Sequence, residues 1–149
     1  MMGIEVVPFR PEHLVRLILA PVVADIQPLL ESEAYRQQHD IPGLAYTGLI
    51  DGVPMGSAGL IPHRPTVARA WALPGKDLPL KAWPAITRSA LFLFNEAHKA
   101  GFKRLEILTK ASSETACRFA GRLGFSNPKT LDCYFDDGSD AVLWRRLAR

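Results

Sequence analysis

The stretch that decides the fold is residues 113–125, SETACRFAGRLGF. Its apolar residues recur at intervals of three and four, the spacing of one face of an α-helix: Ala116, Phe119, Ala120 and Leu123. Ser112 or Ser113 can cap the first turn, and Gly124 followed by Phe125 supplies a glycine stop with a hydrophobic contact. The stretch therefore predicts a short amphipathic helix with both ends defined.

Two elements are predicted upstream of this helix. Residues 104–109 are short and apolar, which is typical of a buried strand. A longer helix is expected to begin near Pro84, because proline is tolerated in a first turn, and to stop at Gly101. Apolar residues line one of its faces: Ile86, Ala90, Leu93, Phe94 and Ala97. We expect this to be the central helix of the fold.

The N-terminal part predicts a strand followed by helical turns. Residues 4–9 are β-branched and aromatic and contain Pro8, which is typical of a short edge strand. Apolar residues at helical spacing lie on both sides of Pro21: Leu14, Leu17 and Ile18, then Val22, Val23, Ile26, Leu29 and Leu30. The pattern predicts two consecutive helices or one bent helix, before a polar run over residues 31–40.

A hairpin is predicted in the middle of the chain. Residues 44–50 and 53–61 read as strands on either side of Asp51 and Gly52, and an Asp-Gly pair is the strongest short hairpin signal. Gly56 and Gly59 weaken the second strand and indicate a bulge or a close backbone approach.

The remaining strands complete the order of elements. Residues 66–73 predict a strand that ends at Pro74, and a closing hairpin is expected from strands over 131–136 and 140–147 with a turn at Asp137 and Gly138. The order is β-α-α-β-β-β-α-β-α-β-β. The 149 residues, 48% of hydrophobic type, suit one domain over residues 1–149 of the α/β class, with an α+β mixed sheet.

This order, together with residues 113–125, resembles the GCN5-related N-acetyltransferase (GNAT) fold, an acyl-CoA N-acyltransferase fold. The late helix of that family is usually written Asn-x-x-Ala, then an aromatic residue, then Leu-Gly-Phe, and Ala116, Phe119 and Leu123 to Phe125 stand at these positions. The element order is similar over most of the chain, and the sequence pattern over about residues 73–125. The resemblance implies transfer of an acetyl group from acetyl-CoA to an amine.

The resemblance also implies a coenzyme site. In the family, a glycine-rich loop before the central helix holds the pyrophosphate with backbone N–H groups. The matching segment is residues 73–84, LPGKDLPLKAWP. It departs from the family pattern, because Asp77 adds a negative charge, Pro79 and Pro84 have no N–H, and Trp83 is bulky where small residues are expected. The residues expected to bind the cofactor are Leu73, Gly75, Lys76 and Ser113.

A second departure concerns the leaving thiolate. Family members often carry a tyrosine after the aromatic residue of the late helix, where its hydroxyl can protonate the thiolate, but Ala120 stands there and Ser113 occupies the asparagine position. These departures resemble acetyltransferase-like proteins encoded by tailed bacteriophages, including the small internal virion protein. Two functions follow: an acetyltransferase with a degenerate phosphate loop, or a non-catalytic virion protein, for ejection or assembly, that keeps the fold as a scaffold.

An acetyltransferase also needs a base that takes a proton from the amine. Glu106 and His63 are the catalytic candidates. For Glu106 the favoured interpretation is a structural carboxylate paired with Arg104, since charges in strands are most often paired or solvated. His63 is expected in a loop between strands, where a histidine is usually only solvated. Glu31 and Glu33 follow the second predicted helix, where the family gathers acceptor-binding residues, and equally fit a solvated helix end.

The composition of the chain reduces the classes of partner that we expect it to bind. The chain has 18 Lys plus Arg against 15 Asp plus Glu, and apart from Arg145, Arg146 and Arg149 the basic residues are spread thinly, so nucleic-acid binding is not expected. Cys117 and Cys133 lack metal-ligand spacing and read as reduced core thiols, and no metal site is expected. No apolar run approaches the ~20 residues of a membrane span. A cytoplasmic or virion-enclosed protein fits, with acyl-CoA, an amine or virion proteins as partners.

Overall fold

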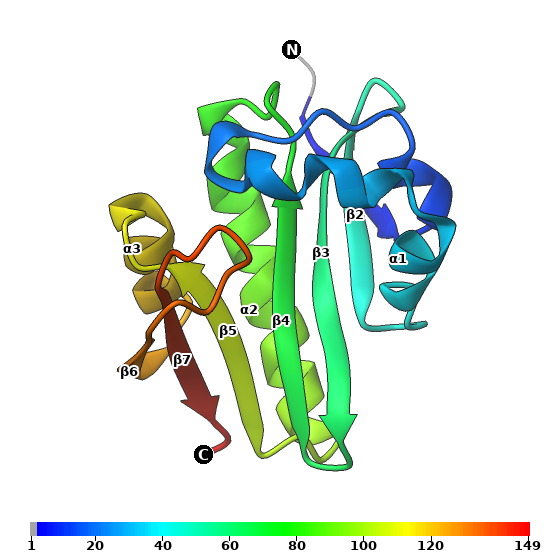
Figure 1. Cartoon of the computed structure of the whole chain (residues 1–149). Helices are drawn as coiled ribbons and strands as arrows, with labels where there is room; N and C mark the ends of the chain where they lie inside the picture. The colour runs from blue at the N-terminus through cyan, green and yellow to red at the C-terminus, as the bar shows by residue number, and fades with distance from the viewer. Residues whose placement is uncertain (1–2) are drawn as a thin grey trace. The chain divides into compact units, whose positions relative to one another are not determined.

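The computed structural model describes residues 3–149 and contains a seven-stranded mixed sheet (Figure 1). The strands are β1 (Glu5–Pro8), β2 (Ala45–Ile50), β3 (Val53–Arg64), β4 (Val67–Pro74), β5 (Arg104–Lys110), β6 (Ser126–Leu131) and β7 (Ala141–Leu147). The helical elements are the 3-10 segments η1 (Pro11–Leu14), η2 (Pro21–Glu31) and η3 (Leu80–Ala82) and the α-helices α1 (Glu33–Gln38), α2 (Trp83–Lys99) and α3 (Glu114–Arg122). The strand order is β1-β2-β3-β4-β5-β7-β6.

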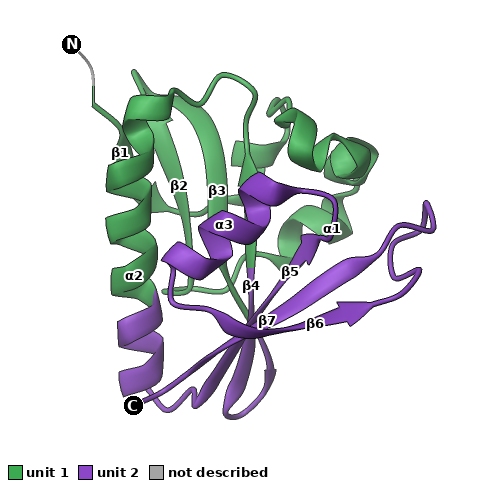
Figure 2. Ribbon diagram, turned by 90° about the vertical axis from the view of Figure 1, so that its left-hand side faces the viewer, with its two compact units in different colours: residues 1–61, 71–93 green, residues 62–70, 94–149 purple. Residues whose placement is uncertain are grey.

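Two compact units alternate along the chain (Figure 2). Unit 1 comprises Met1–Ile61 and Trp71–Leu93, and unit 2 comprises Pro62–Ala70 and Phe94–Arg149. β3, β4 and α2 each contribute residues to both units. The α/β class and the mixed sheet that the sequence predicts are confirmed.

The predicted hairpin forms the sheet of unit 1. Asp51 and Gly52 both have positive φ angles, 52° and 76°, which is the geometry of a type I′ turn between β2 and β3. Met55 is an extra residue between two cross-strand pairs and makes a bulge in β3. A side chain at Gly59 would overlap the carbonyl oxygen of Leu44, so the close backbone approach expected at this glycine is confirmed.

The helical layer of unit 1 corrects the sequence prediction. The two helices expected between residues 11 and 30 are the 3-10 segments η1 and η2, and the α-helix α1 lies in what was read as a polar run. Pro28 inside η2 has no N–H, and Val23 (φ −125°, ψ 16°) leaves the helical conformation. α1 begins because the Ser32 side chain accepts a hydrogen bond from the backbone N–H of Tyr35 at 3.2 Å.

These segments and the sheet of unit 1 enclose an apolar core, which consists of Phe9, Leu14, Leu17, Leu19, Leu30, Ala45 and Leu73. The ring of Trp71 lies against this core, edge-on to Phe9 with the ring centroids 5.6 Å apart and edge-on to His39 at 4.4 Å. Aromatic pairs in this arrangement contribute beyond the area they bury. Trp71, a residue of β4, therefore packs this strand against the helical layer.

Two histidines are held neutral in this layer. The ring Nδ1 of His13 lies 3.1 Å from the backbone nitrogen of Arg10 and 2.7 Å from the Thr47 hydroxyl. His39 is buried, and its Nδ1 donates to the Tyr35 carbonyl at 2.7 Å. Burial lowers the pKa of His39, and burial with the positive charge of Arg10 lowers the pKa of His13.

Unit 2 confirms the helix predicted over residues 113–125. Ser113 caps α3 by accepting from the backbone N–H of Ala116 at 3.2 Å. The helix stops at Gly124, whose φ is 89°, and the N–H of Phe125 donates to the Ala120 carbonyl at 3.1 Å. Phe125 then packs edge-on to Phe94 at 5.5 Å, which joins the end of α3 to the part of α2 in unit 2.

The closing hairpin lies elsewhere than the sequence predicts. Its first strand is β6 (Ser126–Leu131) instead of residues 131–136, and Leu131 pairs with Ala141. β6 is almost fully exposed and contains Pro128, so it lacks the alternation that marks a strand. Residues 132–140 form the connection instead, because the Asp140 carboxylate accepts the N–H of Cys133 at 2.9 Å.

The structure also changes two predictions, one about the C-terminal arginines and one about the cysteines. Arg146 lies 5.6 Å from the Phe94 ring and donates to the Leu123 carbonyl at 3.1 Å, whereas Arg145 points to the opposite face of β7, so the C-terminal arginines form no single patch. Cys133 is exposed and is not a core thiol, while Cys117 is half-buried. Within residues 3–149 no helix has the length and apolar character needed to cross a membrane.

The histidines make unit 1 sensitive to acid. His13 and His39 have pKa values lowered from 6.5 in the folded chain. Their neutral forms therefore contribute fully to the free energy of unfolding above pH 6.5, and this contribution is lost as the pH falls below that value. We expect the free energy of unfolding, measured by urea denaturation, to decrease between pH 7 and pH 5. In the variant H39N this decrease should be smaller, because asparagine does not titrate.

The matched control is H63N, since His63 is exposed. This variant should keep the pH dependence of the unmodified chain. An H39N variant with the same pH dependence as the unmodified chain would contradict the assignment.

Candidate functional site

The predicted phosphate loop leaves the end of β4 and leads through η3 into α2, within unit 1. Leu73 is only 3% exposed and belongs to the core of unit 1, so its side chain cannot contact a ligand. The loop begins at Pro74, the last residue of β4, and its single glycine follows directly. The main chain around that glycine determines what the loop can bind.

Gly75 is enclosed on two sides. A Cβ at this position would lie 2.6 Å from the Met55 carbonyl oxygen and 2.8 Å from Cδ1 of Leu17, so no other residue fits without a shift. Its N–H donates to the Met55 carbonyl at 2.8 Å. The N–H expected to be available for phosphate at this glycine is therefore engaged with β3.

A second segment, residues 17–20, lies along the loop, and we call it the strap segment. The backbone N–H of Ala20 donates to the Pro74 carbonyl at 2.9 Å, and the N–H of Lys76 donates to the Ile18 carbonyl at 2.8 Å, on either side of an antiparallel bridge between Leu19 and Gly75. In Figure 1 the blue chain that continues from the strap segment into η2 crosses the end of β4. The N–H of Lys76 is thereby also engaged.

The strap segment is held by one side chain. Oε1 of Gln27 accepts from the N–H of Leu19 at 2.7 Å, and Nε2 of Gln27 donates to the Leu17 carbonyl at 2.8 Å. One amide thus satisfies a main-chain donor and an acceptor that point away from the loop. Gln27 sets the shape of the strap segment and, through it, the position of the loop.

The available donors lie further along, at the start of the helix. The N–H groups of Leu78, Ala82 and Trp83 donate to main-chain carbonyls, and Pro79 and Pro84 have none. Among the residues that the structure describes, the N–H groups of Asp77, Leu80 and Lys81 have no hydrogen-bond partner. Leu80 and Lys81 open the helical segment that continues as α2, where exposed N–H groups carry partial positive charge.

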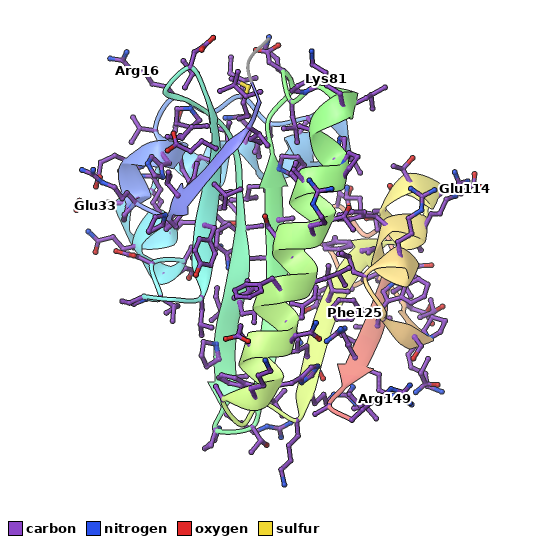
Figure 3. The ribbon with its side chains drawn as sticks, turned by 180° about the vertical axis from the view of Figure 1, so that it is seen from behind. Arg16, Glu33, Lys81, Glu114, Phe125 and Arg149 are labelled. Carbon is purple, nitrogen blue, oxygen red and sulfur yellow. The ribbon has the colours of Figure 1, made fainter. Side chains whose placement is uncertain are left out.

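Side-chain charge points to the same end of the helix. The ammonium of Lys76 lies 3.3 Å from the Asp77 carboxylate, so its charge is already paired. Lys81 is exposed and, as Figure 3 shows, lies at the end of the chain's long helix where that helix begins. Two free N–H groups and a lysine ammonium at one helix start fit a phosphate group.

Ser113, the remaining predicted cofactor residue, belongs to unit 2. Its hydroxyl oxygen caps α3, and its carbonyl accepts from the N–H of Cys117 at 3.1 Å. Close to it, the Thr109 hydroxyl accepts from the indole N–H of Trp144 at 3.0 Å and lies 3.4 Å from the Cys117 sulfur. The thiol also approaches the Lys110 carbonyl at 3.8 Å, so Cys117 is a structural group.

Glu106 is engaged by two arginines of unit 2. Its carboxylate accepts from Nε of Arg104 at 2.7 Å and from Nη2 of Arg69 at 3.1 Å. Burial alone would raise the pKa of Glu106, but the hydrogen bonds and charges of Arg104 and Arg69 outweigh it and hold that pKa below its usual value. The pairing with Arg104 that the sequence suggested is confirmed, and a carboxylate so held is a weak base.

The other candidate bases are exposed. His63 is the last residue but one of β3, and it does not lie in a loop as the sequence predicted. Glu33 accepts a hydrogen bond from the Gln37 side chain at 3.0 Å in the exposed first turn of α1, where Figure 3 labels it, and Glu31 is the exposed last residue of η2. Across residues 3–149 no group of three or more His, Cys, Asp or Glu side chains could hold a metal ion.

Several residues of the loop region and of the Glu106 network carry no signal in the sequence. Gln27 is one of many polar residues near a helix, and its role depends on the fold of the strap segment. Arg69 and Arg145 become neighbours of Glu106 only through strand register. A pairing of Arg104 with Glu106 is the part that alternation along one strand can predict.

The chain has the fold of known acetyltransferases. No protein-family model matches the sequence, and no curated protein matches it significantly. The structure of Ard1 from Thermoplasma volcanium matches with a TM-score of 0.77 and 16% identity, over 99% of each chain. The ribosomal-protein-S18-alanine N-acetyltransferase from Escherichia coli matches with a TM-score of 0.73 and 15% identity, over 97% of this chain and 94% of the other.

A third similar structure contains the coenzyme. An acetyltransferase from Bacillus subtilis in complex with CoA matches with a TM-score of 0.64 and 18% identity, over 99% of each chain. At these identities the similarity shows the fold, and the GNAT acyl-CoA N-acyltransferase fold predicted from the sequence is confirmed.

The strap segment gives a first prediction for this region. In the variant Q27A the N–H of Leu19 and the carbonyl of Leu17 lose their partners, and an unsatisfied buried polar group costs about 1 to 3 kcal/mol. We expect the free energy of unfolding to fall by about 2 kcal/mol in urea denaturation. The control Q38A, at the exposed end of α1, should change it by less than about 0.5 kcal/mol. Equal effects of both variants would contradict this role of Gln27.

Proposed function

We propose that this protein is an acyl-CoA-dependent N-acetyltransferase, which transfers the acetyl group of acetyl-CoA to an amine. The observation that carries the proposal is the start of the helix after β4 in a chain of GNAT fold, where Leu80 and Lys81 present free N–H groups. The similar structure that contains CoA and the N-acetyltransferase from Escherichia coli support it. In this proposal the loop binds the pyrophosphate with the donors of residues 80 and 81, and the ammonium of Lys81 adds charge.

The reaction class makes limited demands on side chains. The amine nitrogen forms a bond with the thioester carbonyl carbon, the carbon–sulfur bond breaks, the amine loses a proton and the thiolate gains one. Ala120 cannot donate that proton, and Glu106 is held by two arginines, so we assign neither as a proton carrier. In the proposal, binding and orientation supply the rate enhancement, and proton transfer uses solvent, since His63 precedes the start of β4 whereas the loop follows the end of that strand.

The alternative is a scaffold without chemistry, the virion role that the phage resemblance implies. The three similar structures described above come from cellular organisms, two of them are named acetyltransferases, and they lend that role no support. One feature is compatible with it: Gly75 and Lys76 donate their N–H groups within the chain. Binding of acetyl-CoA separates the two functions.

A proline substitution tests the phosphate-binding N–H directly. Leu80 is the first residue of η3 and is 86% exposed, and Pro79 before it is extended (φ −74°, ψ 147°), the conformation that a following proline favours. The variant L80P thus removes one N–H without breaking the helix. We expect acetyl-CoA affinity, measured by isothermal titration calorimetry, to fall at least about tenfold, since a hydrogen bond to a charged group contributes about 1.5 to 3 kcal/mol.

The control is L80A, which also removes the exposed side chain but retains the N–H. It should bind acetyl-CoA as the unmodified chain does. If the unmodified chain shows no heat of binding at millimolar acetyl-CoA, the enzyme proposal fails and the scaffold role is favoured. If L80P and L80A bind equally, the coenzyme is held elsewhere.

A further inference from the structure

The two faces of the strands in unit 2 differ in what covers them. Arg146 contacts Phe94 of α2 and the last turn of α3, and Leu105, its cross-strand partner, is fully buried. Figure 2 shows α3 and the end of α2 that belongs to unit 2 on the same side of β5 and β7. The opposite face carries Glu106 and Arg145, which are cross-strand partners. Neither helical element of unit 2 lies on that second face, and we call it uncovered in this sense only: its Glu106 side chain is 12% exposed and those of Arg69 and Arg104 are 32% and 35% exposed.

Arginines gather on the uncovered face. Register places Arg69 beside Glu106 on one side and Arg145 beside it on the other, and Arg104 lies two residues before Glu106 on the same strand face. Two guanidinium groups thus contact the one carboxylate, and Arg145 lies on the neighbouring strand at the cross-strand position, so the cluster holds three positive charges and one negative charge. We call these four residues the arginine cluster.

One carboxylate cannot satisfy three guanidinium groups. The two oxygens of Glu106 are taken by Arg69 and Arg104, at 3.1 and 2.7 Å. Over residues 3–149 the guanidinium of Arg145 has no hydrogen-bond or ion-pair partner, and Nε of Arg69 is buried without one. A buried donor without a partner costs free energy, so the cluster favours a further oxyanion.

The cluster lies close to the end of the parallel ladder. The parallel pairs of β4 and β5 run from Val67 and Arg104 to Ala70 and Ile107, so Glu106 belongs to the last pair but one. On the uncovered face the next residue of β5 is Leu108, about 7 Å further along at ~3.3 Å per residue. An oxyanion at the cluster would therefore lie within the length of a small molecule from the ladder's end.

We propose that the arginine cluster binds the carboxylate or phosphate group of the acceptor, so that the protein acetylates amines that also carry an oxyanion. This rests on the proposed function only for the identity of the ligand as the acceptor. The guanidinium group of Arg145 can donate two parallel hydrogen bonds to the oxyanion. Arg104 and Arg69 add positive charge, and Glu106 keeps those two side chains in place.

Binding of the oxyanion is tested without the coenzyme. Inorganic phosphate and succinate are titrated into the 15N-labelled full-length chain, and the Nε–Hε resonances of its arginines are followed by NMR. We expect saturable shifts for Arg69, Arg104 and Arg145. The variant R145Q should weaken binding at least about fivefold, while E106Q should strengthen it about fivefold, because the amide releases guanidinium donors to the ligand.

The matched control is R118Q. It removes the same charge from an exposed arginine of α3 that pairs with Glu114, and it should leave the affinity unchanged. If R118Q and R145Q weaken binding equally, only net charge attracts the anion and the proposal is overturned. If E106Q fails to fold, the comparison of R145Q with R118Q still decides.

The identity of the ligand is tested by transfer. Acetylation of an amino acid with a free carboxylate is compared with that of its methyl ester, and we expect the free acid to be preferred in the unmodified chain and the preference to be lost in R145Q. Equal rates for acid and ester would overturn the acceptor role. If acetyl-CoA does not bind but the NMR shifts are seen, the proposed function fails and the oxyanion site stands.

Discussion

The packing around Gly75 is the constraint on which the arrangement of unit 1 depends. A main-chain segment can lie between Met55 and Leu17 only where it has no side chain, and hydrogen bonds on both edges then fix it. Because Leu17 and Leu19 are buried in the core on either side of Ile18, the contact that closes on Gly75 also seats the 3-10 layer on the sheet. The loop, the strap segment and the core therefore form one cooperative structure.

This constraint explains why the loop departs from a glycine-rich pattern. The N–H groups next to the glycine complete hydrogen bonds within the chain, so donors for an anion can remain only nearer the helix. Pro84 cannot donate to the Leu80 carbonyl, and Trp83 takes that carbonyl in a 3-10 turn. The N–H groups of Leu80 and Lys81 stay free because both residues precede the first intrahelical donor, and Pro79 and Pro84 supply no N–H.

Local signals made part of the fold predictable. The helix over residues 113–125 and the turn at residues 51 and 52 depend on neighbours in the sequence, and both are confirmed. β6 could not be found, because an exposed strand with Pro128 has no apolar face and its pairing with β7 is tertiary. The 3-10 segments were misread for a related reason: apolar spacing shows which residues are buried, but prolines decide the hydrogen bonding.

The candidate site shows the same limit. Alternation along β5 pairs Glu106 with Arg104, and the sequence can predict that contact, but Arg69 and Arg145 come from strands far apart in the chain. Only strand register shows that both are cross-strand neighbours of Glu106. One carboxylate balances the charge of one arginine, and Arg69, Arg104 and Arg145 are only half-buried, so this face keeps an excess of positive charge that solvent can reach. That excess is the feature that an oxyanion ligand would use.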